Sequence, residues 1–156
     1  MATKKKAARR TATPPLAIKL LMDDHKTVDK LFRQCSRAAR ASERHAIVQK
    51  ICAALTVHAT IEEEIFYPEV RAALKQQDLL DEALVEHGSI KALVAALKSA
   101  RPGDELYDGR VTVLKEYVKH HVKEEEEEMF PKVKRAGLDL TELGERLQEA
   151  KEKMEG

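Results

Sequence analysis

The stretch "HATIEEEIFYP" at residues 58–68 and the stretch "HVKEEEEEMFP" at residues 121–131 follow the same pattern. In both, a histidine is followed four residues later by a glutamate and ten residues later by a proline. Residues four apart lie on one face of an α-helix, so His58 and Glu62 share a face, as do His121 and Glu125. The repeat predicts two equivalent helices that each carry a histidine–glutamate pair.

A weaker repeat precedes each of these stretches. The segment "DHKTVDKLF" at 24–32 aligns with "EHGSIKALV" at 86–94, which places His25 on His87. Each half of the chain therefore combines a helix that carries one histidine with a helix that carries the histidine–glutamate pair. This organisation predicts two helical hairpins related by a pseudo-twofold axis.

Apolar residues recur at three- and four-residue spacing along most of the chain, which is typical of amphipathic helices. The segment "RPGD" at 101–104 is a turn signal, Pro68 is expected to end or kink a helix, and Gly137 is expected to close one. The predicted fold is all-α, an up-down-up-down four-helix bundle with a short extra C-terminal helix. The expected helices cover approximately 16–41, 42–68, 77–100, 105–134 and 141–154.

Composition narrows the class of protein. The chain has 156 residues, 43% of them hydrophobic but only 4% aromatic, and its net charge is +1. The small net charge predicts no nucleic-acid partner, and no apolar run reaches the roughly 18 residues of a membrane span. Two cysteines, Cys35 and Cys52, suit a reduced protein of the cytoplasm.

Three regions are expected along the chain. Residues 1–15 carry five basic residues and no acidic one, which is typical of a disordered, solubilising basic arm. Residues 16–136 are predicted to form the four-helix bundle, and residues 137–156 the C-terminal helix.

Every bundle helix places one histidine in the middle of its apolar stripe. Folding would therefore collect imidazoles and carboxylates in the interior, where an unpaired carboxylate is very costly unless it is neutralised, paired or bound to a metal. A buried polar network without metal is the alternative, but such a network would need no twofold repeat. Six ligands around one ion would saturate it, whereas six ligands shared between two ions would leave open coordination positions. The predicted metal ligands are His25, His58, Glu62, His87, His121 and Glu125.

Further residues are expected near this centre. Glu63 and Glu126 follow the two predicted glutamate ligands and are candidates to support them. Tyr117 lies one turn before His121, and Tyr67 lies near the metal end of its helix; either hydroxyl could donate a hydrogen bond to a bound oxygen species, although packing is the commoner role. The remaining glutamates of the 124–128 run are expected to form a solvated face.

At these residues the sequence resembles the hemerythrin-like (HHE cation-binding) family, over about residues 16–135. The resemblance implies a non-haem di-iron centre, with two iron ions joined by an oxo or hydroxo group. One iron would take His25 and His58 and the other His87 and His121, with two bridging carboxylates, Glu62 and Glu125.

The chain departs from the oxygen-carrying members of that family. Lys91 stands where those carriers have a further histidine ligand, and the carboxylate of the fourth helix is a glutamate closer to its histidine. Lys91 is expected either to act as a cation beside the centre or to extend to solvent. More carboxylate character favours ferric iron, which argues against reversible oxygen carriage.

Three functions remain open from the sequence. The first is a di-iron protein that binds or reacts with dioxygen, peroxide or nitric oxide, with low catalase-like turnover as one form of it. The second is an iron-binding or sensing module without turnover, in which metal occupancy controls stability or partner binding. The third is an interaction protein whose site holds zinc adventitiously.

Overall fold

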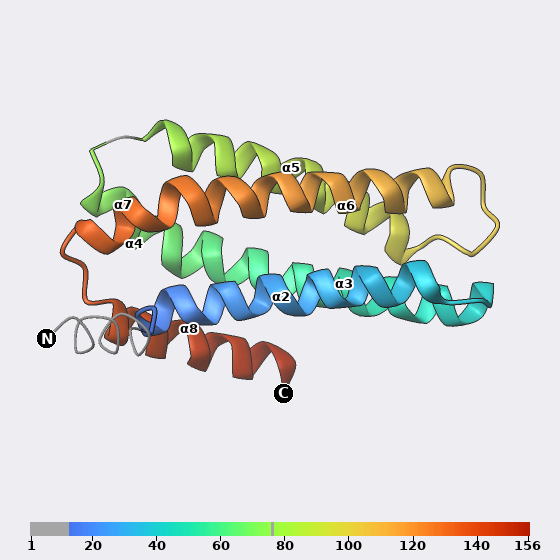
Figure 1. Cartoon of the computed structure of the whole chain (residues 1–156), viewed down its shortest axis with the longest axis horizontal. Helices are drawn as coiled ribbons and strands as arrows, with labels where there is room; N and C mark the ends of the chain where they lie inside the picture. The colour runs from blue at the N-terminus through green and yellow to red at the C-terminus, as the bar shows by residue number, and fades with distance from the viewer. Residues whose placement is uncertain (1–12, 76) are drawn as a thin grey trace, which may run out of the picture.

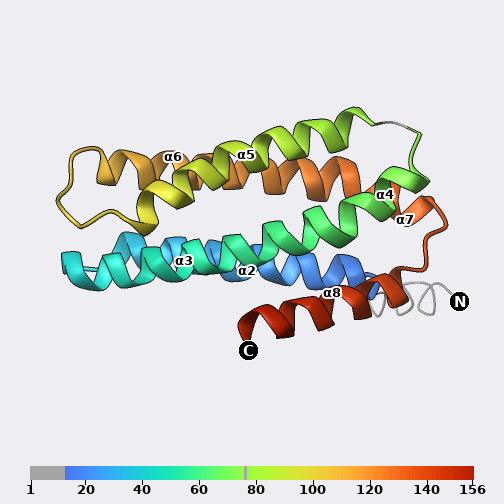
Figure 2. The ribbon, with the colours of Figure 1, turned by 180° about the vertical axis from the view of Figure 1, so that it is seen from behind.

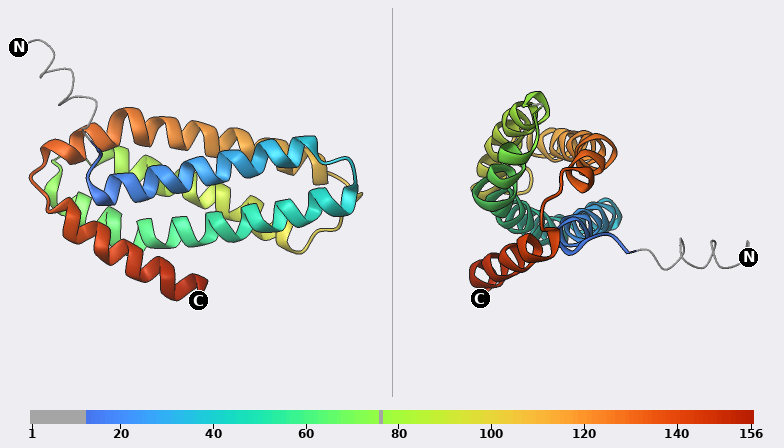
Figure 3. Two further views of the ribbon diagram at one scale, coloured as in Figure 1. Left: turned by 60° about the horizontal axis from the view of Figure 1, so that its bottom comes forward. Right: turned by 90° about the vertical axis from the view of Figure 1, so that its left-hand side faces the viewer.

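The computed structural model describes residues 13–75 and 77–156, and their fold is built on two antiparallel helical hairpins. The first hairpin joins α2 (Leu16–Arg37) to α3 (Ala41–Ile61), and the second joins α5 (Asp78–Lys98) to α6 (Tyr107–Glu124). The hairpins lie side by side (Figures 1 and 2), and the end-on view in Figure 3 shows the four helices around one axis. The predicted all-α bundle is confirmed.

The two repeated stretches form helices that continue past their prolines. After α3, a π-helical turn η1 (Glu62–Phe66) leads into α4 (Tyr67–Ala73), and after α6 the turn η2 (Glu125–Met129) leads into α7 (Phe130–Arg135). The helix does not end at Pro68, because Pro68 occupies the first turn of α4, directly after the π-helical turn. A proline is tolerated there, since a first-turn N–H has no partner inside its own helix.

Several predicted boundaries hold. Gly103, within the predicted turn, and Gly137, after α7, both adopt positive φ, of 93° and 80°. Glycine takes this conformation without the steric cost that a Cβ imposes, and Gly137 follows the end of α7, as predicted for a glycine that closes a helix. Most of the predicted basic arm, residues 1–12, lies outside the described residues.

Two apolar clusters fill the bundle, and a polar layer separates them. Along α2, Leu21 belongs to one cluster and Val28 to the other, and the buried His25 lies between them. Val28 shares its cluster with the two cysteines, which are free and buried. The interruption of the core by buried polar residues is the feature that positions the site.

The last helix, α8 (Leu140–Glu155), packs across α2 and α3 outside the four-helix ring (Figure 3). The Asp139 carboxylate caps its first turn by accepting a hydrogen bond from the Glu142 backbone N–H at 3.0 Å. Gly144 allows a close approach to α2, because a Cβ there would lie 2.6 Å from the Ala17 backbone nitrogen. Among the described residues, no helix is long and apolar enough to cross a membrane.

Candidate metal centre

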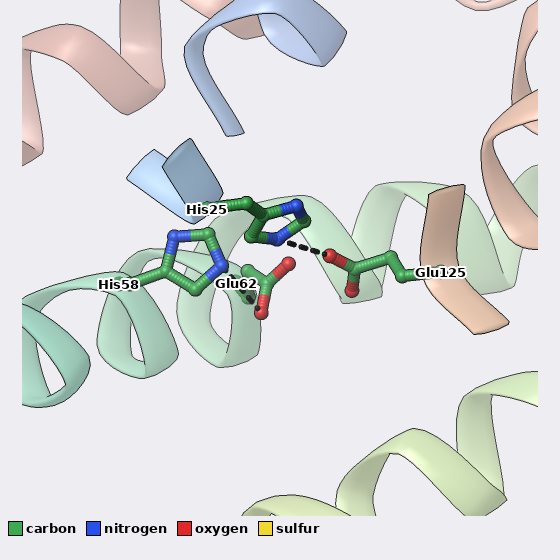
Figure 4. Close-up of side chains that lie close together, drawn as sticks. All are labelled: His25, His58, Glu62 and Glu125. Atoms are coloured by element: carbon green, nitrogen blue, oxygen red, sulfur yellow. Dashed lines mark ion pairs between the residues drawn. The ribbon is translucent and has the colours of Figure 1, made fainter. Parts of the chain in front are cut away.

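Four side chains from three of the bundle helices and their continuations meet within the polar layer. His25 of α2 and His58 of α3 face Glu62 of η1 and Glu125 of η2, as the close-up in Figure 4 shows. One donor atom of each side chain lies within 4.8 Å of the others. His25 Nε2 is 3.0 Å from Glu125 Oε1, and His58 Nε2 is 3.3 Å from Glu62 Oε1.

A second group adjoins the first through a shared carboxylate. Glu62 Oε1 lies 3.1 Å from Nε2 of His87 on α5 and 4.0 Å from Nε2 of His121 on α6. Glu125 Oε2 also lies 3.5 Å from His121 Nε2. The structure thus brings all six residues of the predicted ligand set together, in two groups of donors that overlap at Glu62.

Four buried atoms of the first group form no hydrogen bond, although two of them, His25 Nε2 and Glu125 Oε1, face each other at 3.0 Å. These buried atoms are His25 Nε2, His58 Nε2, Glu62 Oε2 and Glu125 Oε1. Buried polar atoms are rarely left unsatisfied, because each such atom costs about 1–3 kcal/mol of folding free energy. Imidazole nitrogens and carboxylate oxygens that converge without partners form the donor set of a transition-metal site, so these residues fit a bound cation.

Each histidine is held from behind by a carboxylate. Because a carboxylate only accepts, the Nδ1–H groups donate: His25 to Glu126 at 2.6 Å, His58 to Asp24 at 2.9 Å, His87 to Glu63 at 2.8 Å and His121 to Glu86 at 2.7 Å. Such contacts fix the ring tautomer and leave Nε2 free to face the centre, as is common around metal-bound histidines.

Two of these supporting carboxylates, Glu63 and Glu126, are the ones that the sequence analysis placed near the centre. The other two, Asp24 and Glu86, were missed. Each directly precedes a lone histidine in the weaker repeat, but its carboxylate reaches the histidine of the neighbouring helix. The acidic residue shared by "DH" and "EH" was the sequence signal for them.

The remaining predicted neighbours lie farther out. Lys91 forms an ion pair with Glu63 while its side chain stays 54% exposed, so it touches the support of His87 and also reaches solvent. Tyr117 is 47% exposed, whereas the six residues of the donor groups are buried, so its side chain lies at the surface and not in the cluster. The expectation that Tyr117 reaches the centre is therefore corrected.

Tyr67, the other tyrosine considered as a hydrogen-bond donor, lies at the centre. Its hydroxyl donates to Glu125 Oε2 at 2.6 Å and lies 3.2 Å from Glu62 Oε1. The same oxygen is 3.3 Å from His87 Nε2 and 3.4 Å from His121 Nε2. The π-helical turn accounts for this position, since it sets Tyr67 five residues after Glu62 with its N–H bonded to the Glu62 carbonyl.

Without a metal, protons hold these groups together. Burial opposes a charge on His58, but the Glu62 carboxylate and the hydrogen bond to Asp24 raise its pKa to about 10. Burial also opposes a charge on His121, and the carboxylates of Glu125 and Glu62 raise its pKa to about 11. Burial acts to raise the pKa of Glu62, but the charge on His58 and hydrogen bonds from His121, His58 and His87 hold it well below its usual range. A metal ion would take over the charge balance that these protons supply.

Comparison with known proteins agrees with this geometry. The model of the hemerythrin HHE cation binding domain matches residues 16–133. A crystal structure of a hemerythrin HHE cation binding domain-containing protein from Mycobacterium kansasii superposes with a TM-score of 0.74 at 27% identity, covering 87% of this chain and 85% of that one.

A curated relative, named as a DNA nickase of Nostoc sp., is 30% identical over 111 residues. The match covers 71% of this chain but only 31% of the length of that relative. The family match spans the four bundle helices and includes every residue of the two donor groups. The chain belongs to the hemerythrin HHE cation binding domain family.

Proposed function

We propose that this protein holds two iron ions in its polar layer and binds or reacts there with a small molecule such as dioxygen, peroxide or nitric oxide. The observation that carries the proposal is the pair of overlapping, buried donor groups, together with the four buried donor atoms of the first group that form no hydrogen bond. His25, His58, Glu62 and Glu125 would hold one ion, and Glu62, Glu125, His87 and His121 the other.

The donor chemistry supports iron over a soft-metal site. The set contains imidazoles and carboxylates and no thiolate, since both cysteines are buried in the apolar cluster around Val28. Imidazole with carboxylate suits iron, whereas thiolates favour structural zinc or iron–sulfur clusters. When bound, the two ions would supply Lewis acidity and a reservoir of electrons.

A small cavity beside the histidines supports a small ligand. It has a volume of about 30 Å³ and is lined by the four histidines, with apolar walls that include Val28, Leu55 and Ile90. A volume of this size admits a molecule about as large as water. The apolar walls would limit water around the ligand, and the histidine Nδ1–carboxylate pairs would keep the donor atoms in place.

Tyr67 would supply a proton on the side of His87 and His121. Burial and the Glu125 and Glu62 carboxylates raise its pKa well above the usual value, so the hydroxyl stays protonated and can donate. Its present acceptor is Glu125 Oε2, and a ligand that arrives between His87 and His121 would offer it a second one. The position of this hydroxyl supports a proton donor beside His87 and His121.

Metal analysis tests the proposal. Protein expressed with iron should carry about two iron ions per chain. His25→Ala and His87→Ala should each lower the iron content, whereas His45→Ala, at a histidine that contacts Tyr107 and Gln49 and lies outside the donor groups, should leave it unchanged. Unchanged iron in both ligand variants would overturn the assignment. Loss of added peroxide by the loaded protein, abolished in His121→Ala, would support reaction rather than storage.

A second function, iron sensing without turnover, is favoured by one contact. Lys151 of α8 lies 2.5 Å from Asp24 Oδ1, and Asp24 in turn accepts the hydrogen bond from His58. Metal occupancy at His58 would thereby affect the docking of α8. Iron-dependent protection of α8 from hydrogen exchange, with no loss of peroxide, is the result expected of a sensor.

A further inference from the structure

A groove on the outer surface between α2 and α6 lies next to the polar layer but is not part of it. Its volume is about 360 Å³, within the roughly 300–1,000 Å³ of small-molecule sites. His25 lines one part of it, and Phe32, Val118 and Val122 give it apolar walls. The charged lining residues are Lys26, Asp29, Lys115, Lys119, Lys123, Glu126 and Glu127.

The rim of this groove carries an excess of unpaired positive charge. Lys115, Lys119 and Lys123 follow one another at four-residue steps along α6, and Lys26 contributes from α2. Within residues 13–75 and 77–156, none of these four lysines forms a hydrogen bond or an ion pair.

Two of the three lining carboxylates are already engaged. Asp29 pairs with Arg33, and Glu126 accepts a hydrogen bond from His25. Four ammonium groups thus face three carboxylates, which leaves the lining with a net charge of +1. The groove is therefore complementary to a negatively charged occupant.

The apolar walls narrow the class of occupant further. An inorganic anion would satisfy the lysines but would leave Phe32, Val118 and Val122 in water, whereas a molecule with an apolar body would bury them. We infer that the α2–α6 groove is a binding site for a small organic anion with an apolar body, such as a medium-chain carboxylate. The carboxylate would lie among the lysines and the chain along the valines.

The groove also lies over a wall that it shares with the inner cavity. His25, Val118 and Val122 line both spaces. An occupant of the groove would cover this wall from outside and restrict the passage of small molecules to the histidines. This second part of the inference rests on the proposed function, whereas the binding site itself does not.

Calorimetry on the full chain, as purified with its metal, tests the binding site. The probe is decanoate, kept below its micelle-forming concentration, with acetate and decyltrimethylammonium as comparisons. We expect decanoate to bind with one molecule per chain, and acetate and the cationic amphiphile at least tenfold more weakly. Equal binding of the cationic amphiphile would show nonspecific adsorption and overturn the proposal.

Charge reversal provides the matched variants. The double variant Lys119→Glu, Lys123→Glu should weaken decanoate binding at least tenfold, whereas Lys50→Glu, on the exposed surface of α3, should change it less than twofold. Circular dichroism would show whether both variants remain folded. Decanoate binding of equal strength in the double variant and the parent protein would overturn the site. Displacement of decanoate by a lower concentration of a polyglutamate peptide would also overturn it and would indicate an acidic protein partner.

Peroxide loss by the iron-loaded protein tests the shared wall. Saturation with decanoate should slow this loss severalfold, and in the double lysine variant the same decanoate concentration should not. If decanoate binds but the rate is unchanged, the entrance part of the inference fails while the binding site stands. If the protein neither holds iron nor consumes peroxide, the proposed function fails, and the calorimetric result still decides the groove.

Discussion

The Tyr67 hydroxyl donates a 2.6 Å hydrogen bond to Oε2 of Glu125, on the opposite hairpin. Phe130 occupies the equivalent position in the repeat and stacks on His25 with ring centroids 6.1 Å apart, so it offers no hydroxyl. Two halves of the chain that repeat the same pattern of histidine and glutamate thus build two unlike donor groups. We expect chemistry that needs a proton to take place on the side of Tyr67.

The variant Tyr67→Phe tests this asymmetry. Because the four histidines and two glutamates remain, iron content should stay near that of the parent protein. The rate of peroxide loss should fall roughly 10²-fold, the lower end of what a positioned general acid contributes. Iron analysis and a peroxide assay provide the measurement. Tyr117→Phe, at an exposed tyrosine of α6, is the control and should change neither quantity.

A second prediction concerns the carboxylates behind the histidines. Asp24→Asn should weaken iron binding about 10- to 100-fold, because the amide holds His58 less firmly and cannot stabilise its charge. Competition with a chelator would measure the change. Asp23→Asn is a close control, since Asp23 pairs with Lys19 at the surface. Equal loss of iron in both variants would show that Asp24 acts through general charge and not through His58.

The pH dependence of the metal-free protein follows from the directions of the pKa shifts. The folded-state pKa values of His58 and His121 are raised from 6.5 to about 10 and about 11. Their stabilisation is therefore complete below about pH 6.5 and is lost as the pH rises through these values. The pKa of Glu62 is lowered from 4.5, so its stabilisation is present above that pH and is lost as the pH falls. Thermal unfolding of metal-free protein should show the highest Tm between about pH 4.5 and 6.5.

Bound iron should counteract the fall in Tm that the metal-free protein shows as the pH rises above about 6.5. Metal ions replace the protons on the histidines, so metal affinity rises with pH. The increase in Tm on iron loading should accordingly be larger at about pH 8.5 than at about pH 6. A stabilisation by iron that shrinks over this interval would mean that the ion does not bind at the histidines.

The packing of α8 gives a further prediction. Gly144→Ala should lower the free energy of unfolding by about 1–3 kcal/mol, because the added methyl group would meet the Ala17 backbone. Gly109→Ala, in the first turns of α6 with open space around it, should instead be neutral or gain up to about 1 kcal/mol. Urea denaturation followed by circular dichroism measures both. The same small loss or gain in the two variants would contradict the close approach of α8.

The Nostoc relative calls for a test of nucleic-acid cleavage. The chain spans about a third of the length of that relative, and its own net charge of +1 favours no DNA partner. We expect supercoiled plasmid to remain intact when incubated with iron-loaded protein in the absence of peroxide, as seen by gel electrophoresis. Nicking that disappears in His25→Ala would contradict this prediction and would assign the activity to the metal centre.

The sequence by itself determined the helices and the identity of the central residues. The spacing of histidine and glutamate four residues apart, placed within apolar stripes and repeated in both halves, implied an interior centre with one histidine from each helix. This inference was available because helical periodicity is a local property, and because a buried carboxylate needs a partner wherever it lies.

Only the tertiary structure decided which carboxylates of one helix support the histidines of another. Asp24 supports His58 and Glu86 supports His121 across the bundle, contacts that depend on which helices become neighbours. The π-helical turns, which set Tyr67 at the centre, depend on an extra residue in the helical turn that a regular 3.6-residue period does not represent. Long-range packing fixes the contacts of Asp24 and Glu86, because they join side chains whose separation in sequence carries no periodic signal.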